Sequence, residues 1–412
     1  MSPQTLRLGL IGLGRAAVSI LPSIISHPHV RITAAADRES SVRDRFGTDF
    51  DVPTYADAEE LVADSEVDAV YISTPHQLHA SQTILAAQNK KHVLVEKPMA
   101  LSLEDCESMR QAAADHGVQI VVGHTHAFDR PIRAMRAIIA GGELGQLAMI
   151  NTWNFTSFLW RPRRPEELDT RRGGGIIFNQ VPHQIDMVRL IGGGLVTSVR
   201  SMTWVLEPSR PTEGSHATFL QFQDGVAATV VYSGYDFFDT DEFHGWIDEE
   251  GQRKTENENG RARRALKTAG SNGEARLKDQ GGYRRYPSAN VGASQQPHFG
   301  ILIASCEKGD IRVASTGLAV YDEHGMSDVP VDPPVAHPDK TSVIDEFYRS
   351  ATTGRAAVHD GAWGEATLEV CLAILESAKD GREIPLSRQV KVRDSEGMSS
   401  TGPVSATEGR RG

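Results

Sequence analysis

At 412 residues the chain is long enough for about two domains, because a single hydrophobic core stops growing at roughly 250–300 residues. Its 43 Lys and Arg residues against 54 Asp and Glu residues give a net charge of −11, which argues against general electrostatic binding to nucleic acid or anionic membranes. The three cysteines lie far apart, and no stretch approaches the roughly 18 apolar residues of a membrane span, so we exclude a disulfide framework and expect a soluble, cytoplasmic protein.

Short β-rich runs alternate with longer amphipathic segments in the first 125 residues. The runs lie at 6–11, 30–36, 68–73, 92–96 and 118–122, and the helical segments at 14–27, 77–89 and 103–116. Ser102 and Asp105 form a start signal for the last of these helices. Nearly continuous apolar strands that alternate with helices are typical of a doubly wound parallel sheet. We therefore expect an α/β fold whose first domain, residues 1–126, is of the Rossmann type.

After residue 127 the pattern changes to longer strands of alternating character, at 147–155, 198–206, 216–222 and 226–235, with a helix near 180–191. This pattern predicts a second, α+β domain over 127–393 with an open, largely antiparallel sheet, closed by a helix near 360–379. The polar stretch 394–412 is predicted to be a disordered tail.

Residues 249–290 form a polar segment inside this second domain. The segment holds ten Lys or Arg residues, six Asp or Glu residues and no Val, Ile, Phe, Met or Trp. Such a composition cannot build its own core. We interpret it as a surface insertion, with a lid or a subunit-contact arm as the alternatives.

A glycine-rich motif follows the first predicted strand directly and leads into a helix; it comprises Gly12, Leu13, Gly14, Arg15, Ala16 and Ala17. In such a GxGxxA motif the first glycine permits a tight turn, the second lets the backbone approach a pyrophosphate, and the alanine allows close helix packing. The helix N-terminus offers N–H groups to the phosphates. We therefore predict a dinucleotide site here.

Asp37 ends the second predicted strand, where a carboxylate can bind the adenosine ribose and repel a 2′-phosphate. This position favours NAD over NADP. Arg38 keeps NADP open as the alternative, because its guanidinium could pair with a 2′-phosphate or stack on adenine.

Two further polar groups end parallel strands, at the sheet edge where ligands of such folds bind. They are Ser73, Thr74, Pro75, His76 and His79 after one strand, and Glu96, Lys97 and Pro98 after the next. We predict that both groups line the cofactor. Lys97 either forms an ordinary salt bridge with Glu96 or orients a substrate hydroxyl and stabilises a developing alkoxide.

With the later GGG…N…HxxD pattern between 173 and 186, these motifs resemble the glucose-fructose oxidoreductase and inositol dehydrogenase (Gfo/Idh/MocA) family over roughly residues 6–390. The resemblance implies an NAD(P)-dependent oxidoreductase in which Lys97 and His183 serve the reacting hydroxyl and Pro98 shapes the turn beneath the nicotinamide. Histidine suits the role of base, because its ordinary pKa lies near neutrality.

One position departs from the family pattern: Asn179 stands where an aspartate usually precedes the histidine by four residues. An amide can orient substrate or ring, but it carries no charge with which to stabilise an imidazolium. Asn179 either takes this orienting role or caps the helix that Pro182 begins. Asp186 either replaces part of the missing charge or is an ordinary acid at a helix start.

The histidine pairs His76 with His79 and His124 with His126 have spacings that metal ligands use, but no Cys or carboxylate set completes a site, and we predict no metal. His126 is instead expected to contact the substrate.

Five arginines precede the glycine loop and are candidates for binding a substrate carboxylate: Arg161, Arg163, Arg164, Arg171 and Arg172. A solvated loop, in which they pair with Glu166, Glu167 and Asp169, is the alternative. This region resembles a branch of the family that contains phthalate 4,5-cis-dihydrodiol dehydrogenases, which implies oxidation of a ring diol to a catechol. Enzymes that oxidise sugars, glycosides and cyclitols are also similar.

An NAD-retaining glycoside hydrolase and a non-catalytic cofactor sensor are the competing function classes. A sensor would need neither Lys97 nor His183. The open sheet further predicts a homodimer or homotetramer, since its exposed face would be buried between subunits.

Overall fold

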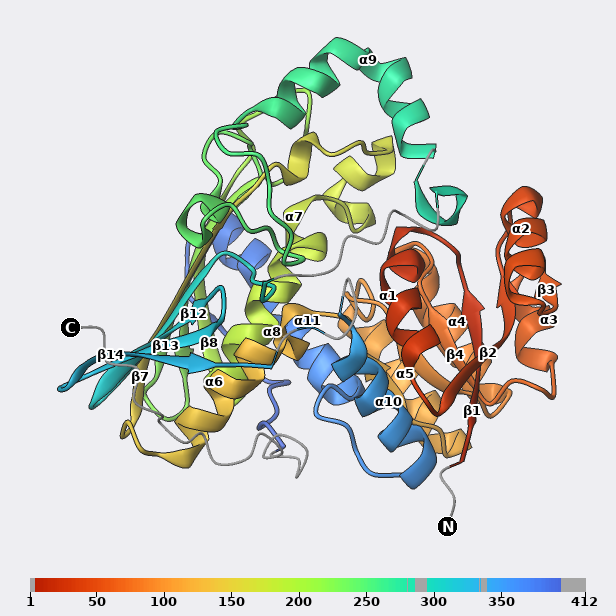
Figure 1. Ribbon diagram of the computed structural model, residues 1–412, viewed down its shortest axis with the longest axis horizontal. Coiled ribbons are helices and arrows are strands. Elements are labelled where there is room, and N and C mark those ends of the chain that lie inside the picture. Colours follow the sequence, from red (N-terminus) through yellow and green to blue (C-terminus); the bar gives the residue numbers. More distant parts are fainter. Residues whose placement is uncertain (1–3, 280, 286–294, 333, 335–338, 394–412) are drawn as a thin grey trace. The chain divides into compact units, whose positions relative to one another are not determined.

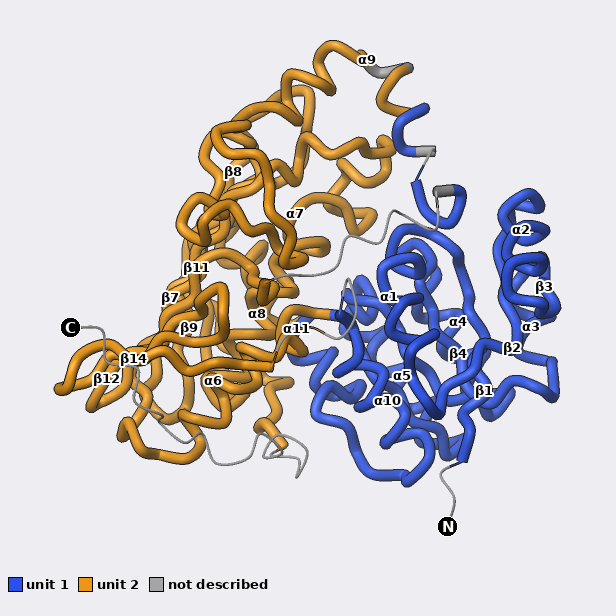
Figure 2. The backbone as a smooth tube through the Cα atoms, viewed as in Figure 1, with its two compact units in different colours: residues 1–124, 276–292, 335–368 blue, residues 125–275, 293–334, 369–412 orange. Residues whose placement is uncertain are grey.

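The computed structural model describes residues 4–279, 281–285, 295–332, 334 and 339–393. The chain divides into two compact units, which Figure 2 colours separately. Unit 1 comprises residues 1–124, 276–292 and 335–368, and unit 2 comprises 125–275, 293–334 and 369–412. The tail predicted over 394–412 lies outside the described residues.

Unit 1 is built on a six-stranded sheet in the order β3-β2-β1-β4-β5-β6, in which every pairing is parallel (Figure 1). Its strands are β1 (Leu6–Ile11), β2 (Val30–Ala36), β3 (Thr54–Tyr55), β4 (Ala69–Ile72), β5 (His92–Val95) and β6 (Ile120–Val122). Its helices are α1 (Arg15–Ser26), α2 (Ser40–Phe50), α3 (Ala58–Ala63), α4 (His79–Gln88), α5 (Leu103–His116) and α10 (Thr341–Thr353), with short 3-10 turns η1 (His76–Leu78) and η7 (Gly282–Arg285).

The five strands and three helices expected in this part of the chain are all present. β4 is buried along its whole length, as expected of a strand covered on both faces. The side chain of Ser102 accepts a hydrogen bond from the Asp105 N–H at 3.1 Å and so caps α5. The sequence analysis did not identify α2, α3 or α10.

Unit 2 contains a nine-stranded sheet in the order β14-β13-β12-β11-β7-β10-β9-β8-β15. Only the β10–β7 pairing is parallel, so the sheet is largely antiparallel, as predicted. Its strands are β7 (Leu147–Phe155), β8 (Val196–Trp204), β9 (Ser215–Phe222), β10 (Ala227–Ser233), β11 (Ile301–Cys306), β12 (Gly309–Ala314), β13 (Gly317–Asp322), β14 (Gly325–Pro330) and β15 (Ile384–Pro385). Its other elements are η2 (His126–Phe128), α6 (Arg130–Gly141), η3 (Phe158–Trp160), η4 (Pro165–Leu168), η5 (Thr170–Arg172), α7 (Gly175–Asn179), α8 (Val181–Ile191) and η6 (Thr240–His244). Helices α9 (Arg261–Asp279) and α11 (Gly361–Asp380) each have residues in both units.

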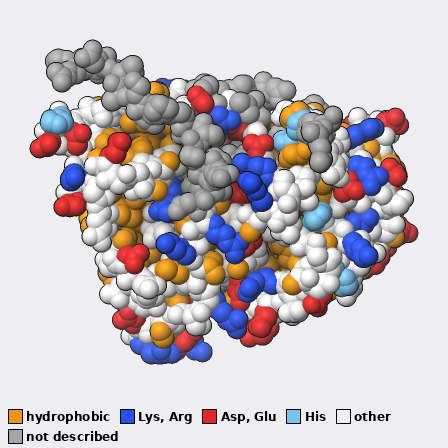
Figure 3. Space-filling model, turned by 90° about the horizontal axis from the view of Figure 1, so that it is seen from below, with side chains coloured by type: hydrophobic (Ala, Val, Ile, Leu, Met, Phe, Trp, Pro, Cys, Tyr) orange, Lys and Arg blue, Asp and Glu red, His pale blue; other side chains and the backbone are white. Residues whose placement is uncertain are grey.

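One face of this sheet packs on α8, where Gln184 donates hydrogen bonds to the Val231 carbonyl and the Thr152 hydroxyl at 3.0 and 3.3 Å. The side chains of β10 alternate between buried and half-buried positions, the period-2 pattern of a sheet covered on one face. Strands β7, β8 and β9 also carry large apolar side chains that are exposed: Met149, Trp153, Met202, Trp204 and Phe219. The view in Figure 3 shows hydrophobic side chains that reach the molecular surface among charged ones.

The polar segment 249–290, which we interpreted as a surface insertion, contains helix α9 and the turn η7. Helix α9 is interrupted at Gly270, whose φ is +62°. Leu266 and Tyr283 are buried, so the segment contributes side chains to the cores of the units even though it builds none itself. Residue 280 and residues 286–290 lie outside the described part of the chain. Among the described residues, no helix has the length and apolar character needed to cross a membrane.

Candidate active site

The glycine turn of unit 1 has the geometry of a dinucleotide site. Gly12 has a φ of +89°, and a Cβ there would lie 3.1 Å from the backbone carbonyl group of Ser73, so this position requires glycine. A Cβ at Gly14 would meet no atom within 4 Å, which leaves the open backbone approach that a pyrophosphate needs. Ala17 is fully buried against the sheet.

The start of α1 also fits the phosphates of NAD. The first turn of the helix carries no acidic residue, so no carboxylate of that turn competes for the positive end of the helix dipole. Arg15 is exposed at this helix start and Ala16 is half-buried behind it.

Asp37 is tied to the same turn. One carboxyl oxygen accepts a hydrogen bond from the Leu13 N–H at 2.8 Å, and the other accepts one from the Glu39 N–H at 2.9 Å. The carboxylate therefore holds the glycine turn against the end of β2, where the ribose of a dinucleotide would bind. Arg38 is exposed beside it.

The polar groups that end β4 and β5 lie next to the glycine turn. The Ser73 hydroxyl donates to the Gly12 carbonyl at 2.8 Å, and the Thr74 hydroxyl donates to Gln82 at 2.6 Å. His79 is fully buried, with its ring nitrogens 2.9 and 3.0 Å from the carbonyl oxygens of Pro98 and Thr74. We therefore revise the role of His79: it ties the two strand-end turns together rather than contacting a ligand. Pro75 and His76, at the start of η1, are exposed and half-buried respectively.

Glu96 and Lys97 lie in a charged cluster that sequence reasoning identified only in part. The Glu96 carboxylate accepts a hydrogen bond from the buried hydroxyl of Tyr71 at 2.6 Å. Burial raises the pKa of Glu96, while the positive charges of Lys97 and Lys340 act in the opposite direction. Lys340 also lies 3.2 Å from Nε2 of His124. Tyr71 and Lys340 were missed, because nothing in their local sequence marks them as neighbours of Glu96.

Unit 2 brings together two of the predicted histidines. The ring centroids of His126 and His183 lie 5.0 Å apart, and Phe299 contacts both rings at 4.6 and 5.0 Å. Nδ1 of His126 is 2.6 Å from a carboxylate oxygen of Asp129, and both residues are buried. A carboxylate at this distance fixes the orientation of the imidazole ring. Asp129 and Phe299 were not predicted.

Asn179 and Asp186 take roles that the sequence left open. The Asn179 amide donates hydrogen bonds to the carbonyls of Gly173 and Gly175 at 3.1 and 2.8 Å, so it fastens the glycine loop. The residue before α8 is Gln180, without a side-chain cap, so the alternative that Asn179 caps this helix is wrong. Asp186 is buried and accepts a hydrogen bond from the Thr125 hydroxyl.

Tyr232 is a further polar residue near Phe299. The two rings are stacked, with their centroids 6.3 Å apart. The Tyr232 hydroxyl lies 2.6 Å from the Thr156 hydroxyl and donates to Gln180 at 3.1 Å. Burial raises the pKa of Tyr232, and the nearby charge of Arg161 opposes this shift.

The predicted arginine group is largely engaged with acids of the same unit. Arg161 pairs with Glu249 at 3.0 Å, and Arg171 pairs with Asp169 at 3.1 Å while its side chain stays exposed. Arg163 stacks 3.9 Å from the Phe158 ring centroid and lies 3.7 Å from Glu167. The Arg164 N–H donates to Glu167 at 2.8 Å, and Arg172 is exposed. Pairing with Glu167 and Asp169 is thus confirmed, and binding of a substrate carboxylate stays a prediction.

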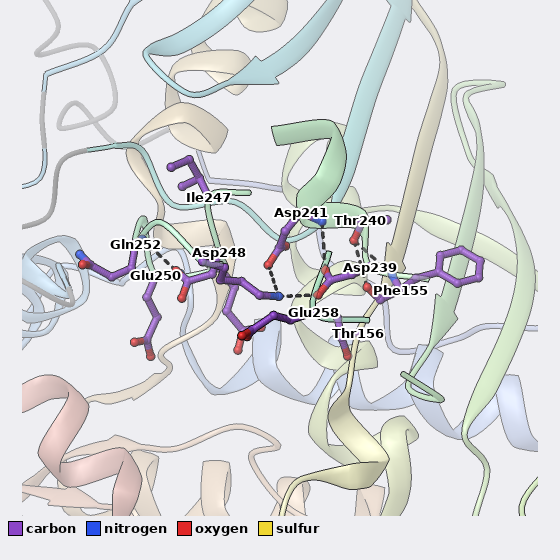
Figure 4. A network of polar contacts seen from close by, with 12 residues as sticks. Phe155, Thr156, Asp239, Thr240, Asp241, Ile247, Asp248, Glu250, Gln252 and Glu258 are labelled. Atoms are coloured by element: carbon purple, nitrogen blue, oxygen red, sulfur yellow. Dashed lines mark hydrogen bonds and ion pairs between the residues drawn. The ribbon is translucent and has the colours of Figure 1, made fainter. Parts of the chain in front are cut away.

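A network of polar contacts orders the loop that precedes the polar segment (Figure 4). Lys254 donates hydrogen bonds to Asp239 and Asp241, and the Thr240 hydroxyl donates to Asn154 at 2.9 Å. Burial raises the pKa of Asp241 to about 7. His298 lies 3.6 Å from Asp241, and burial lowers its pKa to about 4, with the charge of His126 acting in the same direction. The network therefore reaches His298, the residue before Phe299 in the chain.

Comparison with known proteins agrees with this geometry. Residues 6–124 match a family model described as an oxidoreductase family with an NAD-binding Rossmann fold, and residues 132–244 match the C-terminal domain of the same family. A 1-carboxy-3-chloro-3,4-dihydroxycyclohexa-1,5-diene dehydrogenase of Comamonas testosteroni is 38% identical over 386 residues, which cover 91% of this chain and 95% of that protein.

Solved structures give the same result. The crystal structure of a Bordetella bronchiseptica RB50 protein assigned as a dehydrogenase is 41% identical, with a TM-score of 0.88 over 93% of this chain and all of that one. An Agrobacterium radiobacter oxidoreductase in complex with NAD+, L-tartaric acid and magnesium shares the fold at 20% identity, with a TM-score of 0.71 over 93% of this chain and 98% of that one. The chain belongs to the Gfo/Idh/MocA family of NAD-dependent oxidoreductases.

Proposed function

We propose that this enzyme oxidises a carboxylated dihydroxycyclohexadiene to the corresponding catechol, with NAD as the hydride acceptor. The observation that carries the proposal is the likeness to the Comamonas testosteroni dehydrogenase, which extends over nearly the whole of both chains. Hydride leaves a hydroxyl-bearing ring carbon and the hydroxyl proton passes to a base. The resulting hydroxydienone tautomerises: the proton on the other hydroxyl-bearing ring carbon is lost and the carbonyl oxygen takes up a proton, which gives the catechol, and the gain of aromaticity favours this direction.

We assign the proton of the reacting hydroxyl to the imidazoles of unit 2. His183, the half-buried member of the pair, is assigned as the base, and His126 supports it as an imidazole oriented by Asp129. The negative charge of Asp129 takes the place of the charge that Asn179 lacks. Lys97 of unit 1 is assigned to stabilise the developing alkoxide through its positive charge. Its neighbour Glu96 is half-buried and accepts the hydrogen bond of Tyr71.

Arg161 is our candidate for the substrate carboxylate. Its side chain is one-quarter exposed, and its charge acts on Tyr232, whose ring is stacked 6.3 Å from that of Phe299, the residue that contacts both imidazoles. Glu249 accepts a hydrogen bond from one amino group of the guanidinium, and a planar guanidinium has further N–H groups for a second carboxylate.

The test is NADH formation measured by absorbance over a panel of carboxylated cis-dihydrodiols, unsubstituted dihydrodiols, inositols and glycosides. We expect turnover of the carboxylated dihydrodiols, and a loss of at least about 1000-fold in kcat in Lys97→Met and His183→Asn with NAD binding retained. Turnover confined to inositols or glycosides would overturn the substrate class. Retained turnover in both variants would overturn the assigned residues, and glycoside cleavage without NADH would indicate a hydrolase.

The same enzyme is proposed to act in the cytoplasm as a homodimer or homotetramer. The exposed apolar side chains on β7, β8 and β9 support the oligomer, because a sheet face that carries two tryptophans is costly to leave in water. Light scattering at micromolar concentration tests this, and Trp153→Glu should shift the mass toward the monomer. A wild-type mass equal to that of one chain would refute it.

A further inference from the structure

The turn η7 of the polar segment lies directly on the glycine turn of unit 1. The Tyr283 N–H donates a hydrogen bond to the Leu13 carbonyl at 3.1 Å. A Cβ on Gly282, whose φ is +71°, would lie 3.1 Å from the Leu13 carbonyl oxygen and 3.3 Å from Cα of Gly14. Only glycine allows this close approach of two backbones. The polar segment 249–290, whose role its composition could not assign, thus contacts Leu13 and Gly14 of the glycine turn.

Tyr283 anchors this contact in a core of its own. The residue is almost fully buried, and its ring lies 4.9 Å from Phe46 and 6.2 Å from Phe50 on α2. Its hydroxyl donates to Asp49 at 2.8 Å. Arg45 lies 5.4 Å from the ring centroid and donates to the Arg284 carbonyl at 2.9 Å. The turn η7 is therefore fixed to α2 as well as to the glycine turn.

A third contact reaches the adenosine end of the site. Arg284 pairs with Glu39 at 3.0 Å, and the Glu39 N–H is one of the two donors to the Asp37 carboxylate. The other donor is the N–H of Leu13, whose carbonyl receives Tyr283. Asp37 and η7 thus hold the same peptide turn from two sides.

We propose that Gly282, Tyr283 and Arg284 form a cofactor clamp that preorganises the glycine turn and retains NAD by its adenosine half. The clamp fixes the turn before the cofactor binds, so less ordering is left to oppose binding. The clamp concerns binding of the cofactor alone, and it does not depend on which substrate the enzyme oxidises.

The experiment measures binding, without any substrate. The probes are NAD and ADP-ribose, titrated by calorimetry, together with the dissociation rate of NADH by stopped-flow fluorescence. For Gly282→Ala and Tyr283→Ala we expect the Kd of both probes to rise about 10-fold and NADH to dissociate correspondingly faster. Tyr283→Phe, which keeps the ring packing, should bind within about threefold of the wild type.

Gly117→Ala is the matched control. Gly117 has nearly the same left-handed φ, +68°, but a Cβ there meets no atom within 4 Å, so the variant carries the backbone strain without the contact. Unchanged affinity in Gly282→Ala and Tyr283→Ala would overturn the clamp. Equal loss of affinity in Gly117→Ala would overturn it too, because the effect would then follow stability. If Tyr283→Ala does not fold, Gly282→Ala decides. NAD binding that responds as expected while no dihydrodiol is oxidised would refute the proposed substrate and leave the clamp standing.

Discussion

Gly14→Ala should separate cofactor binding from folding. The φ of Gly14 is −75° and its ψ is −163°, an extended conformation that alanine adopts without strain, and the added Cβ meets no atom of the protein within 4 Å. Alanine is a poorer residue than glycine before a helix by about 0.5–1 kcal/mol. Replacing glycine by alanine also restricts the unfolded chain and stabilises by about 0.4–1 kcal/mol. These two effects nearly cancel.

The same methyl group fills the space through which a pyrophosphate approaches the backbone. We expect the midpoint of thermal unfolding of Gly14→Ala to stay within about 3 °C of the wild type, since the net change in stability is below about 0.5 kcal/mol. The Kd for NAD should rise at least about 100-fold, which corresponds to about 2.7 kcal/mol.

Gly12→Ala is the informative contrast. It adds a Cβ in the left-handed region, 3.1 Å from the carbonyl group of Ser73, so it should lose both stability and affinity, by about 2–4 kcal/mol in unfolding. Calorimetry with NAD and differential scanning measure the two quantities on the same samples. Wild-type affinity in Gly14→Ala would refute the placement of the pyrophosphate at this turn.

Two further predictions concern unit 2. Burial lowers the pKa of His216 to about 3, so the folded state keeps this ring neutral while the unfolded chain binds a proton near pH 6.5; the stability present above that pH is lost as the pH falls, by about 2 kcal/mol between pH 7 and pH 5. Urea unfolding followed by tryptophan fluorescence should show a loss about 2 kcal/mol smaller in His216→Gln than in the wild type, because His298, whose pKa is also lowered, contributes equally in both, and an equal loss in both would contradict the prediction. Asp129→Asn should lower kcat about 10- to 100-fold with a KM within about threefold, since the amide orients His126 without its charge. Glu369→Gln, which removes a buried carboxylate bound to the N–H groups of Ser387 and Arg388, is the control, and an unchanged kcat in Asp129→Asn would remove the pair from the mechanism.

Much of unit 1 could be predicted because its signals are local. The strand-turn-helix around Gly12 and Gly14 is encoded within a dozen consecutive residues, and the cap at Ser102 within four. The positions of Lys97 and Glu96 followed from a rule of topology, that parallel strands end at one edge of the sheet. The largely antiparallel sheet of unit 2 followed from alternation along its strands.

The contacts that complete the candidate site join residues far apart in sequence. His126 and His183 were identified separately, but Phe299, which contacts both rings, lies in a stretch without any motif. Tyr71 lies inside strand β4 and Lys340 at the start of α10, and both act on Glu96. A tyrosine in an apolar strand is indistinguishable, by sequence pattern, from an ordinary core residue. The roles left open for Asn179 could be decided only by seeing which carbonyls its amide binds.

By itself, the sequence determined the fold class, the dinucleotide turn, the family and the residues whose chemistry suits hydride transfer, because each depends on short patterns of residue type. The tertiary structure alone decided which acids partner which bases, that Arg161 pairs with Glu249, and that the turn η7 of the polar segment lies against Leu13 and Gly14. Those facts depend on long-range packing, because the burial of a side chain and the partner of a charge are set by residues that no local sequence pattern connects.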